Sequence, residues 1–453
     1  MTSLPLRAAT LPEPVTRALA AAGLPSDSLG VWVQPLDKDR PRLAFNAGRA
    51  FNPASTIKLV TTLAALEILG PDYTWTTRAW SDGRIRGGRL EGDLYLEGRG
   101  DPFLVTEYFV KLLRGLRRRG IDTIAGNLLV DNGFLAPREG DSLDGRDHRA
   151  YNARPDALLL NFRSLRLEFY PTADRVRVVT DPPLAGLRVD NRLKLTAGRC
   201  PGRPPVAARV VAGERGWTLR LSGGYPRACG QGVLYRTVPG EEELIYGVFQ
   251  ALWQELGGRI MGGAARGRVP KEARLLYELQ SRPLAELVRG VNKFSNNVMA
   301  RQLLLTLGAE RFGPPGTEAK GRRAVEDWLA GRGLNIPALV LDNGAGLSRQ
   351  ARISPEGLGR LLVAGWQGPW AGEFMASLPI AGRDGTLARR FRGTMADRAH
   401  LKTGTLAGVR ALAGYVRAAS GRRYGVVVMI NHPRAARARG VEEAVVEWIY
   451  RSG

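Results

Sequence analysis

The sequence predicts a multi-domain α/β (α+β) fold, in which helices flank an antiparallel sheet and a large region is inserted. Three observations support this prediction. The chain has 453 residues, more than one ordinary hydrophobic core accommodates. Strand patterns stand at both ends of the chain, with helical patterns between them. Residues 164–240 carry almost only strand patterns, which indicates a small all-β module.

The predicted domains follow from these changes of pattern. The two terminal segments, 1–75 and 275–453, form one domain because both contribute strands to one sheet. Residues 76–163 and 241–274 mix short strands, glycine turns and helices, and they form an inserted α/β domain. The all-β domain, 164–240, lies within that insertion.

The individual elements are assigned in chain order. Residues 11–24 have the periodicity of a short amphipathic helix, and residues 29–37 alternate as a strand does. A long helix is predicted to begin at Ser55, because apolar residues recur after it at helical spacing. Further helices are predicted at 103–120, at 241–258 and, with breaks, across 280–365, followed by strands at 400–419 and 424–432 and a closing helix at 441–450.

Charge and hydropathy narrow the class of protein. The formal net charge is +23 and the sequence pI is about 10.7, with the basic residues spread over the chain. Since no DNA- or RNA-binding motif accompanies them, we expect a basic surface suited to anionic envelope polymers rather than a nucleic-acid groove. No apolar run approaches the roughly 18 residues of a membrane span. No signal peptide is visible, so a cytosolic chain and an exported chain without its signal both remain open.

Two cysteines, Cys200 and Cys229, flank a segment rich in glycine, proline and arginine. They either close that segment as a disulfide or remain two separate thiols. No further cysteine or nearby histidine completes a zinc site, and we expect neither a metal nor a cofactor. A disulfide would indicate an oxidising compartment.

The usual histidine-based catalytic motifs are missing from the sequence. The chain contains three histidines, His148, His400 and His432, and it has no G-x-S-x-G, H-E-x-x-H or P-loop pattern. A hydrolase with this sequence therefore needs a base other than histidine.

The stretch FNPASTIKLV offers such a base. Ser55 and Lys58 are three residues apart and share one face of the predicted helix. Burial lowers the pKa of a lysine, and a neutral amine can accept the proton of a serine. The alternative is a capping serine followed by a lysine whose amine reaches solvent. The pair alone does not decide between these two interpretations.

Two further short motifs favour the chemical interpretation. An S-x-N motif occurs at 295–297, and a K-T-G-T motif occurs at 402–405 on a predicted C-terminal strand. Together with the S-x-x-K motif they appear in the order S-x-x-K, S-x-N, K-T-G. This ordered trio, rather than any one tripeptide, predicts nucleophilic catalysis by a serine.

The trio resembles that of the penicillin-binding protein and serine β-lactamase superfamily. The long segment between the first two motifs is similar to that of the D-alanyl-D-alanine carboxypeptidase/endopeptidase family, the class C low-molecular-mass penicillin-binding proteins. Similar stretches cover nearly the whole chain: GRGDPFL, GNLLVDNGF, YNARPDALLLNF, DNGAGLSR and SLPIAGRDGTL. The resemblance implies a penicillin-binding-protein/β-lactamase-like transpeptidase domain, with an antiparallel sheet flanked by helices.

The resemblance implies acid–base roles for the motif residues. Ser55 is the acylated nucleophile, and Lys58 is the base that activates it. Ser295 relays a proton to the leaving amine. Asn297 binds the peptide part of the substrate and helps to position Lys58, while Lys402 adds positive charge to the site.

Substrate-binding roles follow in the same way. Thr403 and Thr405 bind the terminal carboxylate of the substrate, and Gly404 permits a close approach on the strand edge. The backbone N–H groups of Ser55 and Thr405 form the oxyanion hole. Asp131 and Arg349 match by position the groups that bind the ammonium and the carboxylate of the diamino acid in the stem peptide. The alternative is a turn-capping aspartate and a surface arginine.

The implied activity is that of a serine-type D-Ala-D-Ala carboxypeptidase and/or D,D-endopeptidase. It acts on peptidoglycan stem peptides and is inhibited by β-lactams. Because the family is exported, the resemblance favours a periplasmic or extracellular location in the cell envelope. It also favours the disulfide between Cys200 and Cys229.

Two other functions remain open at this point. A β-lactamase shares the trio but must release its acyl group quickly. A catalytically dead protein that binds peptidoglycan or nucleic acid would account for the net charge, although all the motif residues are present. The oligomeric state and the third residue of the stem peptide do not follow from the sequence.

Overall fold

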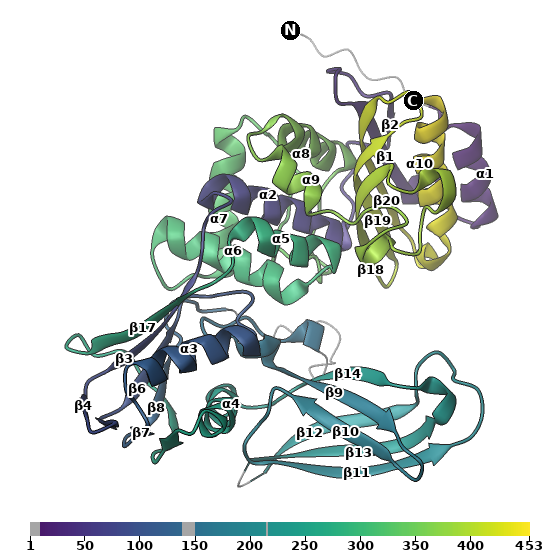
Figure 1. Cartoon of the computed structure of the whole chain (residues 1–453). Coiled ribbons are helices and arrows are strands. Elements are labelled where there is room, and N and C mark those ends of the chain that lie inside the picture. The colour runs from purple at the N-terminus through teal and green to yellow at the C-terminus, as the bar shows by residue number, and fades with distance from the viewer. Residues whose placement is uncertain (1–9, 138–149, 214–215) are drawn as a thin grey trace. The chain divides into compact units, whose positions relative to one another are not determined.

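The structure is a computed structural model that describes residues 10–137, 150–213 and 216–453 (Figure 1). The chain forms two compact units. The terminal unit comprises Met1–Tyr73 and Pro283–Gly453, and the inserted unit is Thr74–Arg282. The two chain ends thus share one unit, and the middle of the chain forms the other.

The terminal unit is built around a five-stranded antiparallel sheet whose strands come from both chain ends. The strand order is β18-β19-β20-β1-β2, with bounds Ala399–Leu406, Val409–Arg417, Arg423–Asn431, Leu29–Pro35 and Leu43–Phe45. β1 pairs with β20 along its whole length. The central strands are buried on both faces because helices cover both sides of the sheet.

Helices form a layer on each side of this sheet (Figure 1). On one side, α1 (Glu13–Ala21) packs against α10 (Arg439–Ser452), and their apolar side chains join those of the sheet in one hydrophobic cluster. On the other side, α8 (Pro355–Gln367) contacts β1 and β20. The remaining helices of the unit are α2 (Lys58–Leu69), α5 (Leu284–Lys293), α6 (Asn297–Phe312), α7 (Glu318–Gly331) and α9 (Ala371–Ala376).

Helix α2 is buried on nearly every side. Its sequence KLVTTLAALEIL is apolar all round, which suits a helix surrounded by other helices. The sequence predicts that this helix begins at Ser55, but α2 begins at Lys58, and Ser55 lies in a 3-10 turn, η2 (Ala54–Ile57). The difference lies in the first turn, because η2 runs directly into α2 but has the tighter 3-10 conformation instead of the α-helical one.

The inserted unit contains a five-stranded sheet in the order β16-β8-β6-β3-β17. Its strands are Ala264–Arg266, Leu128–Asp131, Leu94–Gly98, Thr76–Ser81 and Arg274–Gln280. One predicted boundary needs correction here. The sequence placed residues 275–282 with the terminal segments, but they belong to the inserted unit because β17 pairs with β3.

A smaller four-stranded sheet and two helices complete this part of the inserted unit. The sheet has the order β15-β7-β5-β4, with bounds Arg259–Ile260, Thr123–Ile124, Arg89–Glu91 and Arg84–Arg86. The helices are α3 (Thr106–Arg118) and α4 (Glu241–Glu255).

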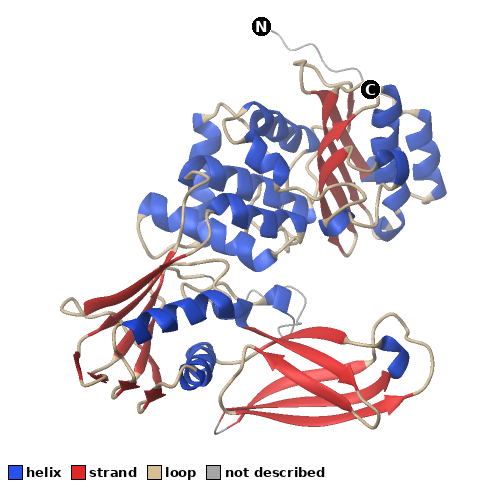
Figure 2. Cartoon of the chain, in the orientation of Figure 1, coloured by secondary structure: helices blue, strands red, loops and turns tan. Residues whose placement is uncertain are grey.

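The described part of residues 164–240 consists of two three-stranded sheets (Figure 2). One has the order β10-β9-β14, with bounds Val176–Asp181, Ser164–Pro171 and Gly232–Thr237. The other has the order β11-β13-β12, with bounds Leu187–Thr196, Gly216–Pro226 and Val206–Gly213. Their buried side chains belong to the same hydrophobic cluster as those of α3 and α4. A separate all-β domain at 164–240 therefore stays a prediction.

The structure joins Cys200 and Cys229 in a disulfide, with 4.8 Å between their Cα atoms. The bond links the connection between β11 and β12 to the short turn after β13. The sequence left open whether the two cysteines form a disulfide or remain separate thiols, and in the structure they form the disulfide.

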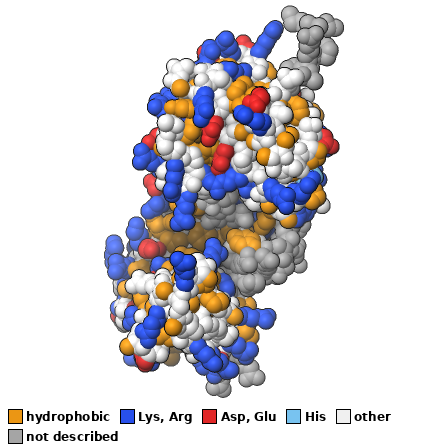
Figure 3. All heavy atoms as spheres, turned by 90° about the vertical axis from the view of Figure 1, so that its right-hand side faces the viewer, with side chains coloured by type: hydrophobic (Ala, Val, Ile, Leu, Met, Phe, Trp, Pro, Cys, Tyr) orange, Lys and Arg blue, Asp and Glu red, His pale blue; other side chains and the backbone are white. Residues whose placement is uncertain are grey.

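The surface is basic in both units. Figure 3 shows Lys and Arg side chains scattered over the visible face, with fewer Asp and Glu side chains among them. This distribution agrees with the formal net charge of +23. Among the described residues, every helix is too short or too polar to span a bilayer.

Candidate active site

Ser55 lies on a tight turn whose shape is held by two asparagines. The backbone N–H of Ala54 donates to Asn52 Oδ1 at 2.9 Å, and the N–H of Asn52 donates to Asn431 Oδ1 at 2.7 Å. Asn431 Nδ2 donates in return to Asn52 O at 3.1 Å. Because Asn431 is the last residue of β20, these bonds fasten the serine's turn to the central sheet.

Lys58 follows one turn later and is completely buried. Its Nζ lies 3.0 Å from Ser55 Oγ and donates to Asn297 Oδ1 at 2.7 Å and to the carbonyl of Ala345. Burial holds the pKa of Lys58 well below its ordinary value, and the positive charge of Lys402 lowers it further.

Only one of the three hydrogen-bond partners of Lys58, the hydroxyl group of Ser55, can donate a proton. The oxygens of Asn297 and Ala345 only accept, so they remain acceptors whether the amine is charged or neutral. The hydroxyl of Ser55 can also donate. A neutral Lys58 amine would therefore use its two hydrogens on the two carbonyl oxygens and direct its lone pair at the hydroxyl proton of Ser55. This arrangement suits the activation of a nucleophile.

The carbonyl that Lys58 meets belongs to the loop DNGAGLSR, residues 342–349. Thr61 Oγ1 donates to Gly344 O at 2.8 Å, which anchors the loop on α2. Gly346 has a φ of 76°, and a Cβ there would lie 2.0 Å from Ala54 O. Only a glycine fits at this point, because both the backbone conformation and the approach to the serine's turn exclude a side chain.

Ser295 and Lys402 form the second polar pair of the site. Lys402 Nζ donates to Ser295 Oγ at 2.9 Å and to Thr403 O at 2.7 Å. Lys402 is completely buried, and burial lowers its pKa to about 7. Ser295 has a φ of 57°, an uncommon conformation that places it on the sharp turn before α6.

The K-T-G-T motif lies on β18, the edge strand of the sheet. A Cβ at Gly404 would lie 2.7 Å from Pro53 O, so this glycine lets the strand approach the turn that carries Ser55. Thr405 is exposed, and Thr403 is half-buried with its Oγ1 2.9 Å from Thr386 Oγ1. An edge strand has backbone groups free of a neighbouring strand, so an extended substrate can bind along it.

An ion pair connects the loop before β18 to the S-x-N motif. Lys293 Nζ lies 2.6 Å from Asp384 Oδ2 and donates to Leu378 O at 2.9 Å. Asp384 Oδ1 accepts the N–H of Ile380 at 2.8 Å. Since Thr386 contacts the K-T-G-T strand, this loop braces two of the three motifs.

Five of the predicted site residues therefore form two hydrogen-bonded groups in the terminal unit, Lys58 with Ser55 and Asn297, and Lys402 with Ser295. The charge of Lys402 acts on Lys58 and so couples the two groups. The two residues proposed for diamino-acid binding lie in different units. Arg349, in the terminal unit, is exposed and donates to Ala407 O at 2.7 Å. Asp131, in the inserted unit, accepts the N–H groups of Gly133 and Val269, each at 3.0 Å, and pairs with Arg268. The predicted roles of Asp131 and Arg349 stay predictions.

Sequence analysis missed several residues that shape the site. Asn52, Asn431, Lys293 and Asp384 are ordinary polar residues in the sequence, and only their long-range contacts distinguish them. Their neighbourhood offered a weak signal, because Asn52 precedes the S-x-x-K motif and Lys293 precedes the S-x-N motif. His148 lies outside the described residues.

The family comparison agrees with this geometry. The model of the D-Ala-D-Ala carboxypeptidase 3 (S13) family matches residues 11–452. A D-alanyl-D-alanine carboxypeptidase of Actinomadura sp. (strain R39) is 32% identical over 412 residues, covering 85% of this chain and 74% of the relative. The carboxypeptidase DacB of Haemophilus influenzae is 25% identical over 414 residues, covering 90% of this chain and 86% of the relative.

Solved structures show the same architecture. Penicillin binding protein 4 (dacB) from Haemophilus influenzae superposes with a TM-score of 0.79 at 23% identity, covering 96% of this chain and 99% of that protein. A predatory peptidoglycan endopeptidase from Bdellovibrio bacteriovorus superposes with a TM-score of 0.55 at 16% identity, covering 93% and 92%. These matches confirm the predicted penicillin-binding-protein/β-lactamase-like fold class. Together with the family match, they show that the chain belongs to the D-Ala-D-Ala carboxypeptidase 3 (S13) family.

Proposed function

We propose that this protein is a serine D,D-peptidase that cleaves the D-Ala-D-Ala end of peptidoglycan stem peptides through an acyl-enzyme on Ser55. One observation carries the proposal. The fully buried amine of Lys58 lies 3.0 Å from Ser55 Oγ, and its other two partners are oxygens that cannot donate a proton. Membership of the family supports the substrate class.

The first half of the reaction forms the acyl-enzyme. Lys58 takes the proton of Ser55 as Oγ attacks the carbonyl of the penultimate D-alanine. The backbone N–H groups of Ser55 and Thr405 bind the oxyanion that develops. Ser295, held by Lys402, passes its hydroxyl proton to the leaving amine and is reprotonated by the proton that Lys58 took from Ser55. D-alanine departs, and Lys58 is neutral again.

The second half releases the shortened peptide. Water attacks the ester on Ser55, Lys58 accepts a proton from that water, and Lys58 returns it to Ser55 Oγ as the ester bond breaks. If the leaving group is a cross-linked diamino acid instead of D-alanine, the same steps give endopeptidase cleavage. A relative named as a D-alanyl-D-alanine carboxypeptidase and a solved structure named as a peptidoglycan endopeptidase support the proposal of both cleavages.

The terminal carboxylate of the substrate binds beside Lys402 and the K-T-G-T strand, and this contact orients the peptide in the site. Lys402 supplies positive charge when protonated, and Thr403 and Thr405 present hydroxyl groups along the edge strand. A β-lactam places an amide carbonyl and a carboxylate in a similar relation, so it acylates the same serine and leaves it slowly. A penicillin binding protein 4 of this fold has been solved in complex with a β-lactam.

We place this activity in the cell envelope, outside the cytoplasmic membrane. The substrate lies there, and the disulfide between Cys200 and Cys229 fits an oxidising compartment. Asp131 and Arg349 remain our candidates for recognising the diamino acid, through its ammonium and its carboxylate respectively.

The test is covalent labelling with a fluorescent penicillin, followed by intact mass and peptide mapping. We expect a persistent adduct on Ser55, none in Ser55→Ala, and an unchanged adduct in the exposed control Ser26→Ala. Rapid release of hydrolysed drug would instead identify a β-lactamase. A folded protein that forms no adduct would contradict the proposed chemistry.

A further inference from the structure

One sheet of the inserted unit presents a strongly cationic face. In the sheet β11-β13-β12, the side chains of Trp217, Leu219 and Leu221 are buried in the hydrophobic cluster of the unit. Because side chains alternate along a strand, the intervening positions of β13 and their partners on β11 and β12 point outward. We name this outward side the arginine face; within these strands its charged side chains are Arg188, Asp190, Arg192, Lys194, Arg209 and Arg220.

The strand register brings like charges together on this face. Arg209 and Arg220 are direct partners across β12 and β13. Neighbouring strands are about 4.8 Å apart, so side chains directly opposite each other are close enough to interact. Like charges at such positions destabilise a sheet. Asp190 offsets only part of this charge, since it lies opposite Arg220 and pairs with Arg192 at 3.0 Å.

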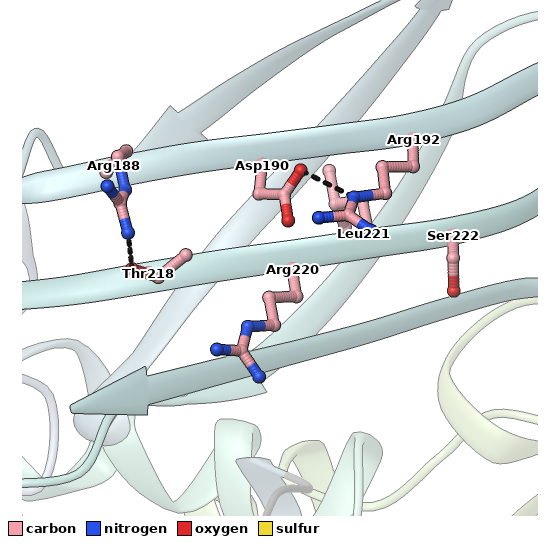
Figure 4. Close-up of a pocket in the computed structure, with 7 residues that line it drawn as sticks. All are labelled: Arg188, Asp190, Arg192, Thr218, Arg220, Leu221 and Ser222. Atoms are coloured by element: carbon pink, nitrogen blue, oxygen red, sulfur yellow. Dashed lines mark hydrogen bonds and ion pairs between the residues drawn. The ribbon is translucent and has the colours of Figure 1, made fainter. Parts of the chain in front are cut away.

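The centre of the arginine face is hollowed. A hollow of about 390 Å³ lies there (Figure 4). It is lined by three arginines, Arg188, Arg192 and Arg220, and by two residues with hydroxyl groups, Thr218 and Ser222. Asp190 and Leu221 complete the lining. Arg188 donates to Thr218 Oγ1 at 3.3 Å, which directs its guanidinium across the sheet. The planar fork of an arginine matches a carboxylate in two parallel hydrogen bonds, and hydroxyl groups add further donors.

The arginine face is one-sided in charge even for a basic protein, because five cations and one anion point outward from it. A solvated sheet face usually alternates the signs of its charges across strands, because opposite-charge pairs stabilise it. Here the direct pairing of Arg209 with Arg220 has the opposite effect, and it lies outside the proposed catalytic residues. Such a local conflict is typical of a binding surface, where a ligand of opposite charge relieves the repulsion.

We propose that the arginine face binds the carboxylates of peptidoglycan stem peptides and so holds the enzyme on its polymeric substrate. This inference rests on the proposed function, which supplies the polymer. Each polymer strand repeats its stem peptides, so a second binding site on the same chain strengthens attachment without a new catalytic contact. The site takes no part in bond cleavage.

The experiment measures sedimentation of the full-length protein with insoluble peptidoglycan from which attached phosphate polymers have been stripped. The Ser55→Ala background prevents digestion during the assay. Combined Arg188→Gln, Arg192→Gln and Arg220→Gln substitutions should weaken binding about tenfold at low salt, since several exposed ion pairs are lost at once. The matched control, Arg114→Gln with Arg118→Gln and Arg289→Gln, removes the same charge from exposed positions elsewhere and should bind as the parent does.

Two further arms test the chemistry of the ligand. Peptidoglycan whose carboxyl groups have been amidated should lose the binding that depends on the arginine face. The single substitution Asp190→Asn should strengthen binding to untreated peptidoglycan about twofold, because it removes a repelling carboxylate and releases Arg192. Equal binding to amidated and untreated polymer, or equal weakening by the control triple variant, would overturn the proposal. Binding that requires the attached phosphate polymers would also overturn it, in favour of a phosphate ligand.

A further experiment distinguishes an error in the proposal for the arginine face from an error in the proposed catalytic function. The triple variant with Ser55 intact should cleave a small soluble peptide at the parent rate while releasing less product from insoluble peptidoglycan. A parent that binds peptidoglycan through the arginine face but forms no adduct with penicillin would sink the proposed chemistry alone. A parent that forms the adduct but sediments equally with or without the three arginines would sink the arginine face alone.

Discussion

The lysines of the active site and the arginines of the arginine face carry the same formal charge in opposite environments. Lys58 and Lys402 are completely buried, and burial lowers both of their pKa values. Arg188, Arg192 and Arg220 are exposed and belong to a residue type that keeps its proton at any physiological pH. Position in the fold thus lowers the pKa of one set of cations, which fits the proton transfers that we propose, and leaves the other set as fixed charges.

Among substitutions of these buried and exposed cations, we expect the largest effect on acylation at Lys58. Replacing it with arginine preserves a positive charge but removes the ability to lose a proton, so acylation by penicillin should fall by about 10³- to 10⁴-fold. Lys58→Met, which cannot carry a proton at all, should fall similarly. Stopped-flow acylation with both variants, checked for folding by circular dichroism, makes the measurement. Substantial activity in Lys58→Arg would show that charge, rather than proton transfer, is the role of this residue.

A smaller loss is expected when the turn of Ser55 is loosened. Asn431→Ala removes the acceptor for the N–H of Asn52 and should slow acylation roughly 10²-fold, because small displacements of a nucleophile are costly. The pH dependence of acylation should keep its shape, since the base is untouched. A shifted pH profile would indicate that Asn431 acts on Lys58 instead of on the position of the serine.

Salt should separate the two sets of cations. Raising the salt concentration from 50 to 500 mM should weaken binding to peptidoglycan several-fold, because exposed charges are screened over a Debye length of a few ångströms. The acylation rate with a soluble penicillin should change little, because the lysines of the site are buried. Sedimentation and acylation are measured in the same buffers. If sedimentation and acylation were equally sensitive to salt, the buried lysines and the exposed arginines would not differ in the way we infer.

The smallest effect concerns stability and its dependence on pH. The pKa of Lys402 is about 7 in the folded protein, below its unfolded value, so the unfolded state binds more protons between these two values. Stability should therefore rise with pH from about 7 towards 10, and the cost of burying the charge is fully present below 7. Lys402→Met removes that cost and should stabilise the protein by about 1–2 kcal/mol at pH 6.

Urea denaturation of the parent and of Lys402→Met at pH 6 and pH 9 makes this measurement. The two proteins should converge as the pH rises. A difference that is constant with pH would mean that the substitution acts through packing, and no proton linkage would then be assigned to Lys402.

The sequence by itself determined the class of the fold, and it predicted the chemistry of the site. Three short motifs in a fixed order predicted Ser55, Lys58, Ser295, Asn297 and Lys402 as site residues. The structure places them in two hydrogen-bonded groups, Lys58 with Ser55 and Asn297, and Lys402 with Ser295. The motifs were readable because each keeps its functional side chains within a few residues. The strand patterns at both chain ends likewise predicted a sheet shared between them, since alternation is a local property of the chain.

Only the tertiary structure decided what surrounds those residues. Asn52 meets Asn431 across the length of the chain, and Lys58 meets the carbonyl of Ala345, a backbone group that leaves no mark in the sequence. The boundary at β17 depended on its pairing with β3. The arginine face arises because the register of three strands aligns cations that lie apart in the sequence. Long-range pairing is set by packing of the whole chain, and no local pattern encodes it.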